Sequence, residues 1–592
     1  MPKKYLSLIV SAVFLLLSLP AIAANPAAEE LADTRILIDI SGSMKNNDPS
    51  NLRRPALRLL VGLLPPDSRA GVWTFGQYVN MQVALGKVDN AWKERARKGA
   101  GQIHSRGLFT NIEEVIRRSI GDWKEASSGY RRNLILLTDG MVDVSKNPAQ
   151  SAASRQRIID ELIPRLQEYG AKVHTIALSE RADHELMQTL SDATGGWYEQ
   201  TDQADKLQRV FLRLFEKVGR PDTVPLKENR FTIDGSISEA TLLIFRQEGA
   251  APTRIVTPSG ESYSAQDSPA TFKWHRDEGY DMLTITTPEV GEWRIEAALD
   301  PDNRVMIVTD LKMHTTELPS KLAVGEQLPF EVSFSEKGQG ITDPAFLDVL
   351  SVQAEQSDAQ GPGEPRPLYD DGENGDAAAA DGRYTLVVGE RAEPGRVELL
   401  LRVEGKTFQR ERRQIYELIP CCRIETQAEG DVTKVVVHAD PELLDSSSVT
   451  VEAALRGADA QPRPVMLLPG AVAGVWETSV DRSTLVGEWA LDMTLKARTI
   501  AANSLLLTFD PVVLNGTAEP PPPAVEPPPA VEPAAEPEPQ TDWMLLSGIF
   551  AGINLLLLVL VAALVWMIRR RGKGDTVQLL DDEEPDAEGA EA

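Results

Sequence analysis

Two short polar segments in the N-terminal third of the chain place oxygen-bearing side chains at spacings that suit a metal ion. Asp39, Ser41 and Ser43 are each separated by one residue, and Thr138 is followed directly by Asp139. Hydroxyl and carboxylate oxygens, without histidine or cysteine, are the ligands of hard cations such as Mg²⁺, Mn²⁺ and Ca²⁺. Asp and Ser also favour turns and helix N-caps, so a capped turn is the alternative interpretation.

Both segments begin where an apolar run ends, and these runs predict the strands of a parallel sheet. Four runs, at 36–40, 70–75, 134–138 and 173–178, alternate with stretches whose apolar residues recur every three or four positions, at 54–64, 111–123, 156–169, 184–194 and 206–218. This alternation is typical of a doubly wound α/β fold. In such sheets ligands bind outside the carboxyl ends of the strands, so both polar segments are expected on one rim.

Residues 30–220 resemble the von Willebrand factor type A family. Its metal-ion-dependent adhesion site combines an Asp-x-Ser-x-Ser loop with a threonine and an aspartate from two further loops. Asp39, Ser41, Ser43, Thr110 and Asp139 match those positions in order. The resemblance implies a Rossmann-like fold in which Ser41 and Ser43 reach the metal directly and Thr110 reaches it directly or through water. It also implies that the aspartates act largely through water and that one position stays open for a partner's carboxylate.

Two choices within this site stay open at the level of sequence. Thr110 is identified by its place before the helix at 111–123, and Ser105 is the alternative for the same role. The metal is expected to be Mg²⁺, with Mn²⁺ or Ca²⁺ as alternatives, because all three prefer oxygen ligands.

Beyond Pro221, helical periodicity gives way to short β-rich runs and turn residues, which predicts β-sandwich domains. We expect a sandwich-like domain at 221–309, an immunoglobulin-like domain at 310–416 and another sandwich-like domain at 417–512. Trp293 and Trp489 each follow Gly-Glu at the start of a predicted strand, and these segments resemble the Gly-x-Trp strand of bacterial immunoglobulin-like modules.

An acidic loop in the middle β-domain suggests a second metal site, for calcium, formed by Asp370, Asp371, Asn374, Asp376 and Asp381. Clustered carboxylate and amide oxygens suit Ca²⁺. The spacing does not match an EF-hand loop, however, and Asp-Gly pairs are strong turn formers, so a solvated turn is the alternative.

Both ends of the chain carry topology signals. Lys3 and Lys4, an apolar run and small residues at 21–23 predict a signal peptide over 1–23. Residues 541–568 are mostly apolar and exceed the ~20 residues that cross a bilayer. Arg569, Arg570 and Arg571 follow this segment, so the positive-inside bias places the acidic tail, 569–592, in the cytoplasm and the folded part outside it.

Several features bear on partners. The Pro-, Ala- and Glu-rich linker at 513–540 predicts a semi-rigid spacer. In the predicted span, Gly548, Gly552 and Asn554 could pack two membrane helices into a homodimer, or could simply reflect the glycine content of membrane helices. The adjacent Cys421 and Cys422 suggest a vicinal disulfide, a bridge between chains, or two unreactive thiols.

Composition narrows the function further. With 592 residues, several domains are expected, and a net charge of −27, from 61 basic and 88 acidic residues, argues against nucleic acid as a partner. Hydrolase and phosphate-loop motifs are absent, so we do not expect an enzyme.

We therefore expect a single-pass membrane protein, by analogy in the inner membrane of a bacterium, that binds an extracytoplasmic protein through a carboxylate on its metal, in adhesion, reception or scaffolding. The alternative is an envelope assembly or stress-sensing factor that signals through its tail, with a purely structural metal.

Overall fold

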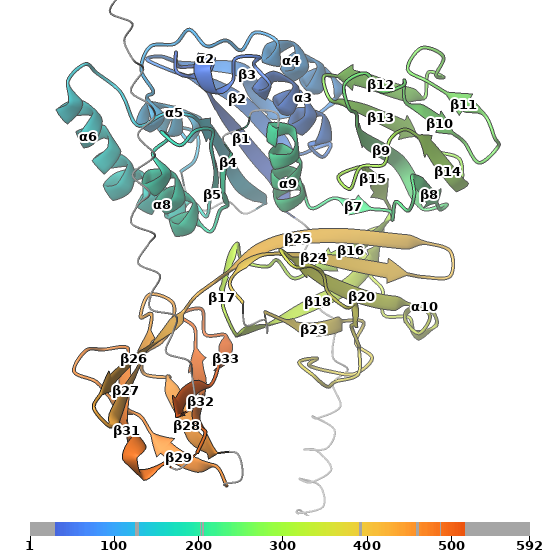
Figure 1. Ribbon diagram of the computed structural model, residues 1–592. Helices are drawn as coiled ribbons and strands as arrows, with labels where there is room; N and C mark the ends of the chain where they lie inside the picture. Colours follow the sequence, from blue (N-terminus) through green and yellow to red (C-terminus); the bar gives the residue numbers. More distant parts are fainter. Residues whose placement is uncertain are drawn as a thin grey trace, which may run out of the picture. The chain divides into compact units, whose positions relative to one another are not determined.

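The computed structural model describes residues 30–124, 129–201, 203, 206–389, 393–457, 461–485 and 487–515 (Figure 1). The predicted signal peptide, nearly all of the linker, the predicted span with Gly548, Gly552 and Asn554, and the acidic tail lie outside these residues. Among the residues described, no helix has the length and apolarity needed to cross a bilayer. The elements below belong to a compact unit that ends at Leu514.

A six-stranded sheet forms the N-terminal part, in the order β3-β2-β1-β4-β5-β6. Its strands are β1 (Leu31–Asp39), β2 (Arg69–Phe75), β3 (Val79–Lys87), β4 (Tyr130–Thr138), β5 (Lys172–Ala177) and β6 (Tyr198–Gln200). Neighbouring strands run parallel, except that β2 and β3 form an antiparallel hairpin. The central strands are buried on both faces, as near-continuous apolar runs require.

Helices cover both faces of this sheet, which confirms the predicted doubly wound α/β fold (Figure 1). They are α2 (Met44–Asn47), α3 (Arg53–Leu63), α4 (Asn90–Ala100), α5 (Ile112–Ser119), α6 (Pro148–Arg157), α7 (Ile163–Glu168), α8 (His184–Thr194) and α9 (Leu207–Gly219). Ile36 and Ile38 face α3 and α9, whereas Leu37 faces α5, because successive strand residues point to opposite faces.

The predicted helix at 156–169 is part of a longer, interrupted one. It begins at Pro148, and a π-helical turn, Ile158–Leu162, joins α6 to α7. Pro164 lacks an N–H group and so cannot continue the regular ladder of hydrogen bonds, which accounts for the irregular turn just before it.

β-sheets follow the α/β domain, as predicted. The first β region holds β7 (Asp222–Thr223), β8 (Arg230–Ile233), β9 (Ile237–Phe245), β10 (Arg254–Val256), β11 (Ser262–Tyr263), β12 (Phe272–Asp277), β13 (Tyr280–Thr286), β14 (Gly291–Glu296) and β15 (Arg304–Thr309). Trp293 on β14 is buried and stacks on Phe231 of β8.

The second β region holds β16 (Leu311–Thr315), β17 (Lys321–Ala323), β18 (Glu326–Glu336), β19 (Gln339–Gly340), the short α10 (Pro344–Leu347), β20 (Ser351–Asp358), β21 (Gly361–Pro362), β22 (Arg366–Pro367), β23 (Tyr384–Val388), β24 (Gly395–Glu404) and β25 (Gln409–Ile419). The third holds β26 (Cys422–Glu429), β27 (Val432–Ala439), β28 (Thr450–Gly457), β29 (Arg463–Met466), β30 (Leu468–Pro469), β31 (Val475–Asp481), β32 (Trp489–Arg498), β33 (Ser504–Thr508) and β34 (Val512–Asn515).

Two of the sheets run across the predicted domain boundaries. One has the order β12-β13-β9-β15-β7-β25-β24-β20-β21, so it joins strands from both sides of residue 309. The link is β7, which pairs with β15 on one side and, at Thr223, with Glu411 of β25 on the other. A second sheet joins β18 to β33, on opposite sides of residue 416. The three β regions are therefore connected by main-chain pairing as well as by linkers.

The α/β domain shares its hydrophobic core with the β regions. The cluster that contains the apolar residues of α3 and α9 also contains six from beyond residue 220: Leu243, Phe245, Tyr280, Met282, Met306 and Ile415. Gly62 of α3 permits this contact, because a Cβ atom there would lie 2.6 Å from Sδ of Met282. Residues 30–220 thus do not enclose their own core.

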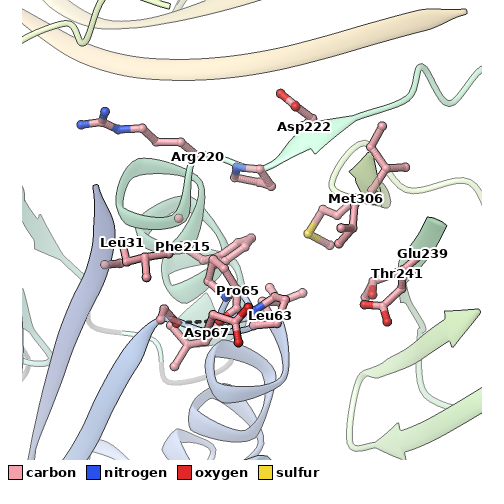
Figure 2. A pocket seen from close by; sticks show the side chains of 18 of the residues that line it. Leu31, Leu63, Pro65, Asp67, Phe215, Arg220, Asp222, Glu239, Thr241 and Met306 are labelled. Atoms are coloured by element: carbon pink, nitrogen blue, oxygen red, sulfur yellow. Dashed lines mark hydrogen bonds between the residues drawn. The ribbon is translucent and has the colours of Figure 1, made fainter. Parts of the chain in front are cut away.

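Polar contacts reinforce the same junction. Arg304 Nε on β15 donates to Glu216 Oε1 on α9 at 2.8 Å, and both side chains are buried. Lys217 Nζ donates to the carbonyl of Ile415 at 3.0 Å. At one edge the junction stays open, as a cleft of about 360 Å³ with Leu63 and Phe215 on one side and Thr241 and Met306 on the other (Figure 2).

We predict that Glu216→Ala destabilises the protein by about 3 kcal/mol, because it leaves the buried Arg304 guanidinium with only its longer ion pair to Asp302, at 3.8 Å. Chemical denaturation followed by circular dichroism measures the effect. The matched control is Glu296→Ala, which removes an ion pair with Arg294 whose side chains are both more than two-fifths exposed, and should change stability by less than about 1 kcal/mol. Equal effects of the two substitutions would contradict the shared junction.

Candidate metal centre

The fold brings the two predicted polar segments to one rim of the sheet. Asp39 is the last residue of β1, and Thr138 is the last residue of the adjacent parallel strand β4. The Thr138 hydroxyl donates to Asp39 Oδ2 at 2.5 Å across this rim. Parallel register therefore places Asp39 and Asp139 side by side, although they are 100 positions apart in the sequence.

The loop after β1 turns its two serines toward Asp139. Asp39 Oδ1 accepts a hydrogen bond from the backbone N–H of Ser41 at 2.7 Å, which folds the loop back over the strand end. The Ser43 hydroxyl donates to Asp139 Oδ1 at 2.8 Å and lies 3.0 Å from the Ser41 hydroxyl. Four of the five predicted ligands thus form one hydrogen-bonded group.

Thr110 reaches the same group on a second loop. Gly107 N–H donates to the carbonyl of Ile40 at 2.7 Å, and a Cβ atom on Gly107 would lie 2.8 Å from that oxygen, so this approach requires glycine. Thr110 Oγ1 and Ser43 Oγ lie 3.4 Å and 4.0 Å from the point where Gly140 would carry a Cβ atom. The threonine hydroxyl therefore lies beside Gly140, the residue after Asp139.

Ser105, the sequence alternative to Thr110, is engaged elsewhere. Its hydroxyl accepts a hydrogen bond from Arg53 Nη2 at 2.6 Å. Arg53 is itself buried and ion-paired with Asp48. The geometry favours Thr110 as the fifth oxygen donor.

Two residues that sequence reasoning did not single out, together with Thr138 of the second polar segment, complete the arrangement. Asn47 Nδ2 donates to Asp139 Oδ2 at 2.8 Å, the Ser179 hydroxyl donates to the backbone carbonyl of Asp139 at 2.6 Å, and Thr138 bonds Asp39 as described. These contacts orient both carboxylates. Only the position of Asn47 soon after the serine loop could have suggested a role from the sequence.

The electrostatics of the site suit a divalent cation. Asp39 and Asp139 are both almost completely buried. Burial, and then the neighbouring charge of Asp139, raise the pKa of Asp39 to about 6, against hydrogen bonds from Thr138 and Ser41 that lower it. Two adjacent buried carboxylates with three hydroxyls form an oxygen donor set for a hard metal, whose charge would favour the ionised form of both acids. The residues present therefore fit such an ion.

Residues 33–212 match the von Willebrand factor type A domain. This segment is a von Willebrand factor type A (VWA) domain. The Asp39–Ser43 loop, Thr110 and Asp139, predicted from the sequence as the metal ligands, all lie within the matched residues. No curated protein matches the chain in sequence.

Solved structures similar to the chain include several VWA proteins. One from Catenulispora acidiphila is 16% identical, with 53% of this chain and 64% of that protein covered and a TM-score of 0.27. The ArnB paralog VWA2 from Sulfolobus acidocaldarius is 15% identical over 53% and 64% of the two chains, with a TM-score of 0.25. Mussel byssus proximal thread matrix protein 1, described with a zinc-occupied MIDAS motif, is 17% identical over 34% and 50%, at 0.26. This chain thus spans half to two thirds of their lengths.

The acidic loop outside the VWA domain brings together three of its five candidates. Carboxylate oxygens of Asp370, Asp376 and Asp381 all lie within 4.8 Å of one another. Asp371 lies outside this group and accepts from the N–H of Glu373, and Asn374 is exposed. Both carboxylate oxygens of Asp370 already accept backbone N–H groups of the loop, so the calcium site and the solvated turn both remain hypotheses.

The two cysteines lie together near the start of the third β region. Their sulfur atoms are 3.6 Å apart, and both are free thiols in this structure. Cys421 is buried and its thiol faces the carbonyl of Val324.

We predict that Asp39→Asn stabilises the metal-free VWA domain at pH 7.5 by about 3 kcal/mol. The folded-state pKa of Asp39, about 6, exceeds the ordinary value of 3.8, so ionisation of this carboxyl opposes folding. The wild type should therefore lose stability relative to the variant as pH rises from about 4 to about 6, with no further change above that range. Denaturation in EDTA across pH measures this; a variant less stable than wild type at pH 7.5 would contradict it.

We predict that Mg²⁺ or Mn²⁺ stabilises the wild type by about 2.7 kcal/mol at one hundred times the dissociation constant, because the ion binds only the folded site. Thermal unfolding with and without EDTA measures the shift, and Asp139→Ala should abolish it. The exposed Asp67→Ala is the control and should leave the shift unchanged. A metal-dependent shift that survives Asp139→Ala would place the ion elsewhere, with the acidic loop as the first alternative.

Proposed function

We propose that the chain captures a protein partner by coordinating a carboxylate of that partner to a divalent metal held by Asp39, Ser41, Ser43, Thr110 and Asp139. The role is one of adhesion, reception or scaffolding. The oxygen donor set and its place on an accessible rim support the proposal.

The observation that carries it is an exposed apolar border around this site. Leu108 precedes Thr110 by two residues and is 68% exposed, and Met141 follows Asp139 by two residues and is 59% exposed. Tyr78, 73% exposed, lies in the β2–β3 turn beside Gly76, whose carbonyl accepts from the N–H of Asn111. Exposed Met and aromatic side chains around a polar centre are typical of a binding surface, whereas a purely structural metal needs none.

The site is also open on one side. Asp39, Thr110 and Asp139 are buried, but Ser43 is exposed, so a metal held between them would face solvent beside Ser43. When bound, the metal supplies a cationic centre whose charge is balanced by the two aspartates, and the three hydroxyl ligands are neutral. A carboxylate from outside would be the natural further ligand, because it is the strongest oxygen donor among protein side chains.

We propose an extracytoplasmic location for this activity. A signal peptide at 1–23, a membrane helix at 541–568 and the basic residues after it would hold the VWA domain on the extracytoplasmic face of a membrane, with a bacterial inner membrane favoured by analogy.

We predict that the full-length, affinity-tagged protein in detergent retains an envelope partner in Mg²⁺ and loses it both in EDTA and in Asp39→Ala. The double variant Leu108→Ser, Met141→Ser should bind metal normally, by the thermal shift described above, yet bind the partner at least about tenfold more weakly, because apolar contacts at a binding surface contribute about 1 kcal/mol or more each. Quantitative pull-down measures both results.

Val290→Ser is the control for surface apolarity, since Val290 is 62% exposed in the first β region. A partner retained in EDTA and in Asp39→Ala would move binding to the β regions and leave the metal a structural role. Loss in EDTA without loss in the double variant would remove the apolar border from the interface.

A further inference from the structure

A polar cavity lies at the amino ends of the parallel strands of the VWA sheet, whereas the candidate metal site lies at their carboxyl ends. It has a volume of about 270 Å³ and is lined by the starts of β4 and β5, the end of α9 and the loop that carries Glu317. Strand β4 runs from Tyr130, at this cavity, to Thr138, at the metal site. Its length, about 25 Å at ~3.3 Å per residue, separates the two sites.

The lining is strongly cationic. The cationic side chains of Lys172, Lys217 and Arg220 line the cavity with the carboxylate of Glu317, and Glu30, Arg131 and Arg132 lie at its border. Glu317 is ion-paired with Lys172, at 2.5 Å, and with Arg220. Burial alone would raise the pKa of Glu317, but the charges of Arg220 and Lys172 outweigh it and hold the pKa at about 2. The Glu317 carboxylate therefore stays ionised and pairs with both Lys172 and Arg220.

Lys217 lies deep in this cavity without a carboxylate of its own. Its Nζ donates to the carbonyl of Ile415 and lies 5.6 Å from the centre of the Trp197 ring, and the described part of the chain offers it no ion pair. Burial, and then the charges of Lys172 and Arg220, lower the pKa of Lys217 to about 7, although Glu317 opposes the shift. The Lys217 amine therefore has cationic neighbours and no anionic partner of its own among the described residues.

His174 adds an unused polar atom. The ring is 1% exposed and lines the cavity, and its Nε2 lies 3.3 Å from Asn133 Oδ1. Its Nδ1 has no hydrogen-bond partner among the described residues. Burial lowers the pKa of His174 to about 3, so the ring is neutral; because its Nε2–H faces Asn133 Oδ1, Nδ1 is an acceptor. Buried nitrogen atoms without a partner are uncommon in folded proteins, so this acceptor points to a hydroxyl-bearing group bound in the cavity.

We propose that this cavity binds a small, multiply charged oxyanion, either a phosphate ester or a polycarboxylate. Several acceptor oxygens on one small ligand would neutralise Lys217 and share Lys172 and Arg220 with Glu317, while a hydroxyl of the same ligand would donate to the neutral His174 Nδ1. The cavity is smaller than the ~300–1,000 Å³ of pockets for drug-sized ligands, which limits the occupant to a small molecule. Its position joins α9 of the VWA domain to the β16–β17 loop, so the ligand would bridge the α/β domain and the β regions.

Isothermal titration of the full-length protein in detergent tests this, with inorganic phosphate, a sugar phosphate and citrate in separate arms at constant ionic strength, and chloride as the blank. We expect saturable binding of at least one of them. Lys217→Met, which removes the amine and keeps the volume, and the more exposed Lys172→Met should each weaken it by about tenfold to a hundredfold, the usual effect of losing a charged hydrogen bond.

Two controls locate the effect. Lys312→Met removes a lysine that lines the neighbouring cleft but not this cavity, and Asp39→Ala disables the metal site; both should bind the anion as the wild type does. Binding of the phosphates alone or of citrate alone would identify the ligand class. No saturable binding, or binding unchanged in both Lys172→Met and Lys217→Met proteins that unfold like the wild type, would overturn the proposal.

Discussion

Helix α9 buries seven apolar side chains on one broad face, and this single property organises the rest of the molecule. An apolar face this broad needs more than one packing partner to cover it. The sheet of the VWA domain covers one side, and strands of the β regions cover another through Met306 and Ile415. Glu216, a charged residue of α9 that is also buried, is ion-paired with Arg304. The VWA domain therefore shares its core with the β regions. Its sheet carries the candidate metal site at the carboxyl ends of the strands and a cationic cavity at their amino ends, where α9 ends.

The metal site shows how a fold can force like charges together. Parallel pairing of β1 and β4 ends with Asp39 and Asp139 adjacent and buried, an arrangement that opposes ionisation of Asp39 in the absence of a cation. Hydrogen bonds from Thr138, Asn47 and the Ser41 backbone hold the two carboxylates in place before any ion arrives. The same burial that penalises the free acids strengthens their attraction for a metal, because the local dielectric constant is low.

Local pattern was sufficient for the buried strands and for most helices of the α/β domain. Apolar runs predicted β1, β2, β4 and β5, and helical periodicity predicted α3, α8 and α9 closely. It missed β3, an edge strand with irregular burial, and α4, whose exposed face is rich in Lys and Arg and whose apolar face is little more than Trp92 and Ala96.

What sequence could not supply was non-local. Motif and topology were enough to predict that Asp39, Ser41, Ser43 and Asp139 lie together. Asn47 and Ser179, in contrast, act only through tertiary contacts with Asp139. The continuous sheet through β7 and β25 likewise depends on a pairing between Thr223 and Glu411 that no local pattern predicts.

The placement of β1 has a mechanical consequence. The strand that ends at Asp39 is hydrogen-bonded to parallel neighbours on both sides along nearly its whole length. A partner that pulls on a metal beside Asp39 along the strand axis would load both ladders in shear, with many hydrogen bonds resisting together, rather than peel them open one by one. The site is therefore anchored on a strand that resists tension through two ladders of hydrogen bonds.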